Sequence, residues 1–174
     1  MPTGETKAEL LINSLKQFYS QSSNLDILLP IIQQKSNISL RILDWLVTNY
    51  SKKYSVNYEF YKNGQKSIFF IYLSYKNQLK AYSKKYFDPF CRRDRLTIDL
   101  KTLHENYEGS IVTTIGQLNF FRWFIENKMI NYVILNVNKI DDDMNSELSD
   151  KGKNKTQKYT GLNIVNESVV ISFN

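Results

Sequence analysis

The sequence predicts an α+β fold with N-terminal helices, an antiparallel β-sheet that contains a hairpin over residues 56–75, and an aromatic-rich helix packed on the sheet. Two observations predict this class. Apolar residues recur at helical spacing in three segments, 7–19, 38–54 and 114–127. Apolar and polar residues alternate, as they do in strands, over 56–61 and again over 95–101. An Asn-Gly pair follows the first of these segments and predicts a hairpin turn. A chain of 174 residues is long enough for one domain with a core.

The first helix is predicted over residues 7–19. Its apolar residues share one stripe, and Thr6 with Glu9 three positions later matches a capping box. The next apolar stretch, 25–34, is either a short helix that begins at Pro30 or an irregular segment.

The second helix is predicted over residues 38–54, with Ser36 or Ser39 as its cap. Lys52 and Lys53 fall in its last turn, where cations complement the helix dipole.

Residues 56–75 are predicted to form a hairpin. Apolar and polar residues alternate over 56–61, and the Asn-Gly pair at 63–64 is a strong signal for a two-residue turn. The run 67–75 is apolar on both faces, so we expect a central strand that is covered on both sides. Residues 77–85 either continue this strand or form a short helix.

A second strand pair precedes the third helix. Residues 95–101 alternate in polarity, and 110–113 are the expected partner strand. The helix predicted over 114–127 is capped by Thr113 or Thr114. Its aromatic residues widen the apolar arc, so we expect burial on more than one side.

The composition divides the chain into three parts. Residues 1–140 are expected to form a single α+β domain. Residues 141–160 are polar and charged with few apolar side chains, which is typical of a flexible loop or linker. Residues 161–174 recover a strand-like pattern.

The charge and the cysteine count narrow the class of protein. The net charge of +6 and a pI near 9.2 favour acidic partners. The single cysteine excludes an internal disulfide framework and a Cys-rich zinc site, and favours a reducing compartment. No apolar run approaches the roughly 20 residues of a membrane span, and no signal peptide is evident. We therefore expect a cytoplasmic protein that does not bind membranes.

Most of the net charge lies in one stretch, residues 76–95, which we call the basic segment. It carries seven cations and two anions, and aromatic rings lie between the cations. Cations neutralise phosphates and exposed rings stack on bases, so this pattern favours nucleic-acid binding. The candidate contact residues are Lys76, Lys80, Tyr82, Lys84, Lys85, Tyr86, Arg92, Arg93 and Arg95. The alternative is a solvated cationic face whose rings turn into the core, and Phe87 and Phe90 fit either role.

The chain shows no catalytic constellation, cofactor motif or metal site. Cys91 lies beside two arginines, but the lone His104 is thirteen residues away, so a buried apolar cysteine is favoured over a nucleophile. Asp88 and Asp94 are expected to pair with neighbouring arginines. The acidic run 141–143 fails the spacing of a calcium loop.

Residues 113–123 carry two interpretations. The stretch is either a helix N-terminus that presents amides to an anion or an ordinary capped helix packed on a sheet, and the second is favoured.

Three blocks, 43–50, 86–93 and 113–123, resemble blocks in a family of short uncharacterised proteins from nucleocytoplasmic large DNA viruses, the giant viruses. The Phe-Asp-Pro-Phe-Cys-Arg-Arg stretch is the most specific, and the resemblance covers about 38–135. It implies a viral protein that works in the host cytoplasm, in viral factories or in virions, with other viral proteins as candidate partners. The family brings no established activity, so no functional residue is carried over.

The sequence leads to two hypotheses of function. The first is a non-enzymatic protein that binds DNA or RNA phosphates through the basic segment. The alternative is a structural or protein-interaction module of a virion or viral factory. The oligomeric state is left open.

Overall fold

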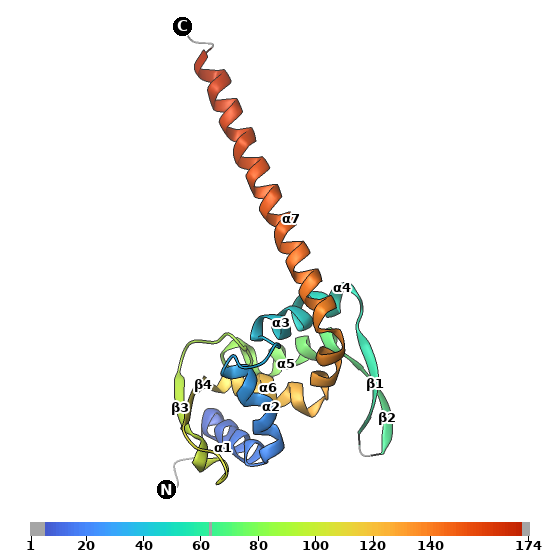
Figure 1. Ribbon diagram of the computed structural model, residues 1–174, viewed down its shortest axis with the longest axis vertical. Helices are drawn as coiled ribbons and strands as arrows, with labels where there is room; N and C mark the ends of the chain where they lie inside the picture. The colour runs from blue at the N-terminus through green and yellow to red at the C-terminus, as the bar shows by residue number, and fades with distance from the viewer. Residues whose placement is uncertain (1–5, 63, 172–174) are drawn as a thin grey trace.

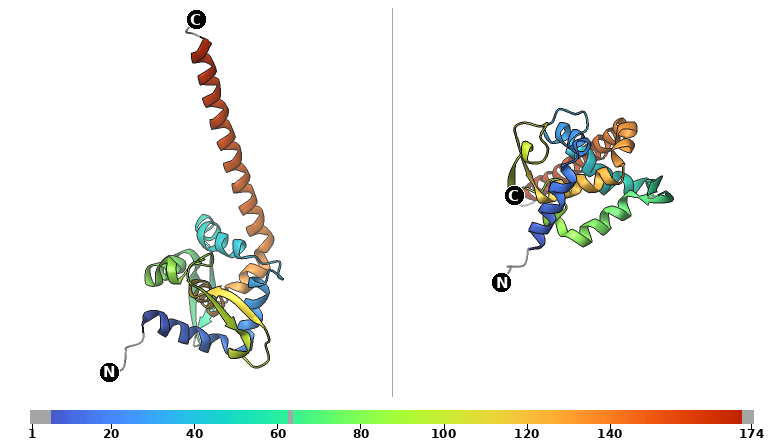
Figure 2. Two further views of the ribbon diagram at one scale, coloured as in Figure 1. Left: turned by 90° about the vertical axis from the view of Figure 1, so that its left-hand side faces the viewer. Right: turned by 90° about the horizontal axis from the view of Figure 1, so that it is seen from below.

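The computed structural model describes residues 6–62 and 64–171, and the side chains of residues 6–61 and 64–150. Most of the described chain is helical, and two antiparallel hairpins lie on opposite sides of the helical part (Figure 1). The long C-terminal helix projects away from the other elements in perpendicular views (Figures 1 and 2). The predicted α+β class is confirmed.

Short connections join the helices and strands along the chain. The elements are α1 (Lys7–Tyr19), α2 (Ser22–Ile32), α3 (Leu40–Trp45), the π-helical turn η1 (Leu46–Tyr50), α4 (Ser51–Lys53), β1 (Asn57–Lys62), β2 (Gln65–Phe70), α5 (Ile71–Tyr86), β3 (Arg95–Asp99), the 3₁₀ turn η2 (Leu100–Thr102), β4 (Ser110–Thr114), α6 (Ile115–Glu126) and α7 (Met129–Ile171). The run α3, η1 and α4 is one continuous helical stretch and corresponds to the helix predicted over 38–54.

Local signals set the starts of the first helices. Glu9 N–H donates to Thr6 Oγ1 at 3.3 Å, and Thr6 N–H donates to Glu9 Oε2 at 2.7 Å, which completes the capping box. Neither alternative predicted for the segment 25–34 is correct: α2 begins at Ser22, ends at Ile32 and holds Pro30 in its last turn. Ser39 is the residue that caps α3, since its Oγ accepts the N–H of Ile42 at 3.3 Å.

The first hairpin forms around the predicted turn. Tyr58 lies opposite Phe69 in the register, Lys62 pairs with Gln65, and Gly64 has a φ of +77° that suits glycine. Asn63, the other predicted turn residue, lies outside the described residues.

The strand predicted over 67–75 is wrong beyond Phe70, where the chain turns into α5. Phe69 is the buried residue of β2, whereas Ile68 and Phe70 are exposed. Ile71 and Tyr75 are buried four residues apart, which is helical spacing. The run that looked apolar on both strand faces is therefore a short strand followed by one face of a helix.

The two hairpins do not form one sheet. Among the residues that the structure describes, β3 pairs with β4 alone, with Leu96 opposite Thr113, and β1 pairs with β2 alone. The predicted single antiparallel sheet is thus two separate two-stranded sheets. Helix α1 lies beside β3, and Ile12 and Ile98 line the same cavity between these elements (Figure 2).

Helix α6 is the centre of the core, and α1, α2, α5 and α7 all contact it. Phe120, Phe121 and Phe124 are almost completely buried, which contributes about 1.5–3 kcal/mol per side chain. The ring of Phe69 in β2 lies 6.3 Å from that of Trp123. The aromatic-rich helix therefore packs against the first hairpin and is buried on several sides, as predicted.

The loop predicted over 141–160 is helical in the structure, as part of α7. Ile140 and Met144 are buried one turn apart, and α7 packs against α3 there, so the first part of the helix is anchored. Once a helix is nucleated, each added residue gains one backbone hydrogen bond, which carries α7 onward through a polar sequence.

Residues 161–171, predicted as strand-like, also belong to α7, and 172–174 lie outside the described residues. The division into a domain over 1–140 and a following linker stays a prediction. No helix in the described part of the chain is both long enough and apolar enough to cross a membrane.

Candidate nucleic-acid interface

The basic segment runs along the second half of α5, through a loop and into β3. Lys76 and Lys80 lie one helical turn apart, about 6 Å along the axis, and both are exposed. Ile71 and Tyr75 lie on the buried stripe of the same helix. The amphipathic pattern of α5 thus directs these two lysines to solvent.

Ser83 interrupts α5 with φ 62° and ψ 167°. This backbone region suits glycine, and another residue there carries about 1–3 kcal/mol of strain. Lys84 and Lys85 follow the kink and are exposed. Lys85 Nζ lies 3.3 Å from Asp94 Oδ2, and the hydrogen bond from this contact raises the pKa of Lys85. Its charge is therefore paired within the protein.

The two tyrosines predicted to stack on bases are both half-buried. The ring of Tyr82 is stacked on Phe87, with centroids 6.3 Å apart. Lys85 Nζ lies 5.4 Å from the centroid of the Tyr86 ring. Tyr82 and Tyr86 also pack against the core, so each ring offers only part of its surface to a ligand.

Phe87 anchors the loop of the basic segment to α6. It is fully buried, with its ring 5.3 Å from that of Trp123 and 5.6 Å from that of Phe120. Asn119 Nδ2 donates a hydrogen bond to the carbonyl oxygen of Tyr86 at 2.9 Å. Of the two roles open to Phe87, the structure shows the core anchor.

Helix α6 approaches the loop most closely at Gly116. A Cβ there would lie 3.0 Å from the carbonyl oxygen of Lys85 and 3.3 Å from the backbone of Asp88. One residue later, Gln117 Nε2 donates to the carbonyl oxygen of Pro89 at 3.2 Å. Residues 113–123 are thus a capped, largely buried helix start whose side chains hold the loop, which is the favoured interpretation of that stretch.

The two acidic residues of the basic segment do not pair with arginines, so that prediction is wrong. Asp88 Oδ1 accepts the N–H of Phe90 at 2.8 Å and fixes the turn that presents this ring. Asp94 pairs with Lys85. No carboxylate among the described side chains lies within 4.0 Å of the Arg92, Arg93 or Arg95 guanidinium groups.

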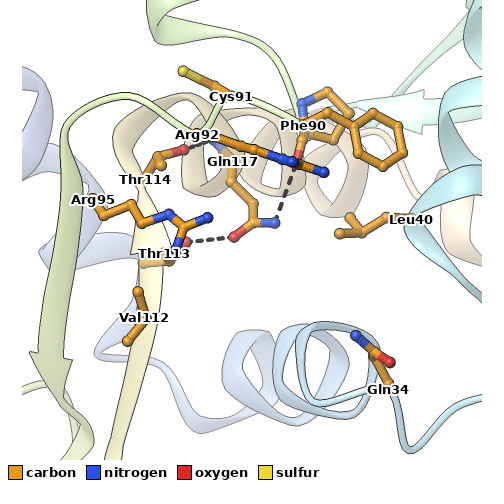
Figure 3. A pocket seen from close by; sticks show the side chains of 11 residues that line it. Gln34, Leu40, Phe90, Cys91, Arg92, Arg95, Val112, Thr113, Thr114 and Gln117 are labelled. Carbon is orange, nitrogen blue, oxygen red and sulfur yellow. Dashed lines mark hydrogen bonds between the residues drawn. The ribbon is translucent and has the colours of Figure 1, made fainter.

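A pocket of about 370 Å³ opens beside this loop, and we call it the arginine pocket. It is lined by Gln34, Leu40, Pro89, Phe90, Cys91, Arg92, Arg95, Val112, Thr113, Thr114 and Gln117. Figure 3 shows Arg92 reaching it from the loop and Arg95 from β3, with the Gln117 amide in view between them. Arg93 does not line it.

The sequence identified only part of this pocket. Arg92 and Arg95 are among the predicted contact residues, and Phe90 was open to a binding role. Gln34 follows the end of α2 and Leu40 begins α3, about fifty residues earlier in the chain, and no sequence pattern connects them to the loop.

Cys91 and His104, the two residues weighed for a nucleophilic site, lie in different loops: Cys91 between α5 and β3, and His104 between η2 and β4. Cys91 lines the pocket and is half-buried, so the fully buried cysteine favoured from the sequence is corrected. His104 packs edge-on against Tyr107 at 5.6 Å, in the loop after η2. Asp88 and Asp94 make the contacts given above and do not line the pocket.

Asp44 on α3 is a partly buried carboxylate near the basic segment. Burial raises its pKa to about 6, the negative charge of Asp88 adds to this rise, and Lys84 opposes it. Its ionised form is therefore disfavoured in the folded protein.

A second charged cluster joins α7 to the stretch α3–η1–α4. Asp143 Oδ1 accepts from Lys53 Nζ at 2.6 Å and from Tyr54 Oη at 2.8 Å, and Oδ2 accepts from Trp45 Nε1 at 3.0 Å. Lys53 also pairs with Glu147 at 3.1 Å. Burial raises the pKa of Asp143, but the hydrogen bonds outweigh burial and the net direction is downward.

The acidic run 141–143 therefore contributes to packing through Asp143. Within the part of the chain whose side chains are described, no group of three or more His, Cys, Asp or Glu residues is arranged to hold a metal ion.

Comparison with known proteins gives a family and a viral relative. A family described as a family of unknown function (DUF7197) matches residues 4–171. The chain is 41% identical over 157 residues, 90% of its length, to "Uncharacterized protein L507" of Acanthamoeba polyphaga mimivirus, and spans about 60% of that relative. No solved structure matches. The resemblance to an uncharacterised giant-virus family is confirmed and extends well beyond 38–135: the chain belongs to the DUF7197 family.

Proposed function

We propose that this protein binds nucleic acid through the basic segment and acts without catalysis. One observation carries the proposal. Six of the seven cations of the basic segment are exposed and have no carboxylate of the described side chains within ion-pair distance: Lys76, Lys80, Lys84, Arg92, Arg93 and Arg95. Unpaired cations concentrated on one segment favour a polyanionic partner.

The fold supports the proposal by holding this charge in place. The segment is part of the folded molecule, because Phe87 is buried and α6 binds the loop backbone through Asn119 and Gln117. Cations on a fixed surface lose less conformational freedom on binding than cations on a free tail.

We further propose that the protein acts in the host cytoplasm, in a viral factory or in the virion. DNA and RNA are both candidate ligands, and other viral proteins are candidate partners. The giant-virus relative supports this setting.

The test is a fluorescence anisotropy titration with labelled DNA and RNA 20-mers at several salt concentrations. For four to six phosphate contacts on duplex DNA, log affinity against log salt should slope by about −4 to −5. The variant with Arg92→Ala, Arg93→Ala and Arg95→Ala should bind more weakly and reduce the slope by about 3. Lys139→Ala, an exposed cation on α7, is the matched control and should change little.

Two results would contradict the proposal. One is no binding to either DNA or RNA at low salt. The other is an affinity that stays the same in the triple arginine variant while the protein remains folded.

A second candidate function is protein interaction, and one surface favours it. On the outer face of the first hairpin, Tyr61, Ile68 and Phe70 are exposed, at 67%, 58% and 48%, and Leu73 follows at 59%. Apolar clusters of this kind often mark interaction surfaces. This alternative predicts self-association by light scattering that persists after nuclease treatment and is lost in Ile68→Glu.

A further inference from the structure

The walls of the arginine pocket differ in chemistry. Phe90, Leu40 and Val112 contribute apolar surface, while Arg92 and Arg95 contribute positive charge (Figure 3). A ligand that satisfies both sides carries a flat apolar part and an anionic group.

The charged side of the pocket has the chemistry to bind a phosphate. Arg92 comes from the loop and Arg95 from β3, so two guanidinium groups reach one pocket from different elements. Guanidinium forks bind phosphate oxygens in bidentate fashion. No described carboxylate pairs with either arginine, so both groups are available to a ligand.

The apolar side presents an aromatic ring. Phe90 is 45% exposed, whereas Phe87, three residues earlier, is completely buried. The hydrogen bond from Phe90 N–H to Asp88 Oδ1 and the contact of Gln117 with the Pro89 carbonyl hold the backbone on both sides of this turn. The ring is thus kept at the pocket by a fixed turn.

Gln117 adds hydrogen-bonding capacity between the two arginines (Figure 3). Its Oε1 accepts from Thr113 Oγ1 at 2.7 Å, and its Nε2 donates to Pro89 at 3.2 Å. One N–H and one lone pair of the amide stay free for a polar edge such as that of a base.

The size and position of the pocket favour one nucleotide of a nucleic-acid strand as its ligand. A volume of about 370 Å³ lies within the range of small-molecule sites and exceeds what a phosphate ion alone fills. The lysines of α5 precede the pocket in the chain and are exposed. In a duplex the base faces are stacked on one another, whereas a single strand exposes them to an aromatic side chain.

We infer that the arginine pocket receives one unstacked nucleotide of a single-stranded nucleic acid, with its base on the Phe90 ring and its phosphate on Arg92 and Arg95. This inference rests on the proposed nucleic-acid binding and makes it more specific. The inference gives the protein a preference for single strands. It also gives a binding role to Phe90, which is not among the predicted contact residues.

The test compares labelled dT12, a 12-base-pair duplex and dTMP in anisotropy and competition titrations at one salt concentration. The native protein should bind dT12 at least tenfold more tightly than the duplex. Phe90→Ala should weaken dT12 binding about tenfold, as expected for loss of one base-aromatic stack, and leave duplex binding unchanged. Phe90→Tyr, which keeps the ring, should bind dT12 like the native protein.

The chain offers matched controls. Phe70 is similarly exposed, at 48%, but lies on β2 outside the pocket, so Phe70→Ala should not change dT12 binding. Arg93 has the same charge and lies in the same loop but does not line the pocket, so Arg93→Ala should cost less dT12 affinity than Arg92→Ala or Arg95→Ala. Circular dichroism confirms that each variant is folded.

The outcomes separate the inference from the proposed function. If no nucleic acid binds at low salt, both are wrong. If binding depends on salt but Phe90→Ala has no effect, or the duplex binds as well as dT12, the pocket inference alone is overturned. If dTMP competes as strongly per molecule as dT12, the pocket is a free-nucleotide site and the strand assignment is overturned.

Discussion

The cations at Lys53 and at the arginine pocket have opposite surroundings. Lys53 lies 2.6 Å from Asp143 and 3.1 Å from Glu147, and this cluster joins α7 to the helices before β1. Arg92 and Arg95 face a pocket, with no described carboxylate within 4.0 Å. A paired cation stabilises the fold and has little capacity for a ligand, whereas an unpaired cation contributes little to folding and is available to an anion. Each variant below tests one side of this contrast.

The largest effect is expected for Phe87→Ala. Phe87 is the core anchor of the loop that carries the arginines, so its truncation should lower the free energy of unfolding by about 3–5 kcal/mol. Phe90→Ala in the same loop should change it by less than about 0.5 kcal/mol. Urea unfolding measures both, and equal midpoints would contradict the distinction between anchor and pocket ring.

The next effect is expected for Asp143→Ala, which removes an acceptor shared by three donors. We expect a loss of about 2–3 kcal/mol at pH 7. Because the pKa of Asp143 is lowered below its ordinary value of 3.8, this contribution is present above about pH 4 and is lost as the pH falls further.

Urea unfolding at pH 7 and pH 3 checks this expectation. Asp142→Ala, the exposed neighbour, is the control and should stay within about 0.5 kcal/mol of the native protein. If the two variants unfold at the same urea concentration, the paired cluster is not a stabilising contact.

A smaller effect of opposite sign is expected for Asp44→Asn. A carboxyl group with its pKa raised to about 6 makes the folded state less stable as the pH rises from 3.8 through 6. Two pKa units correspond to about 3 kcal/mol, and solvent screening at this partly exposed position reduces the figure to about 1 kcal/mol.

Thermal unfolding from pH 4 to pH 8 measures the difference. Asp44→Asn should be more stable than the native protein at pH 7.5, and the two should converge towards pH 4. A constant difference across this range would show that Asp44 does not titrate near 6.

The smallest effect on stability is expected for Arg92→Ala and Arg95→Ala. Without an ion-pair partner in the described structure, each should change the free energy of unfolding by less than about 0.5 kcal/mol. Urea unfolding measures this change. A larger loss of unfolding free energy would mean that the arginines hold the loop and are not reserved for a ligand.

The sequence predicted most elements because their signals are local. The capping box at Thr6 and Glu9 and the turn at Gly64 depend on residues within a few positions, and both are present. The strand over 67–75 failed because consecutive apolar residues fit a covered strand and a buried helix face equally well. The Ile71 and Tyr75 spacing was the available helical signal.

The candidate site was predictable only in part. The cations of the basic segment are evident from composition, and their exposure follows the pattern of α5. Which of them are paired is not a local property: Lys85 pairs with Asp94 nine residues later, and Lys53 with Asp143 ninety residues later. Charge patterns in a sequence do not specify such distances.

By itself, the sequence determined the α+β class, the helical segments 7–19, 38–54 and 114–127, both hairpin locations and the cationic character of residues 76–95. These depend on periodicity, capping and composition, which act over a few residues. Only the tertiary structure decided that Phe87 is a core anchor and Phe90 a pocket ring, and that Arg92 and Arg95 meet Gln34 and Leu40 in one pocket. Those outcomes depend on α6 packing against the loop at Gly116, a contact between segments about thirty residues apart.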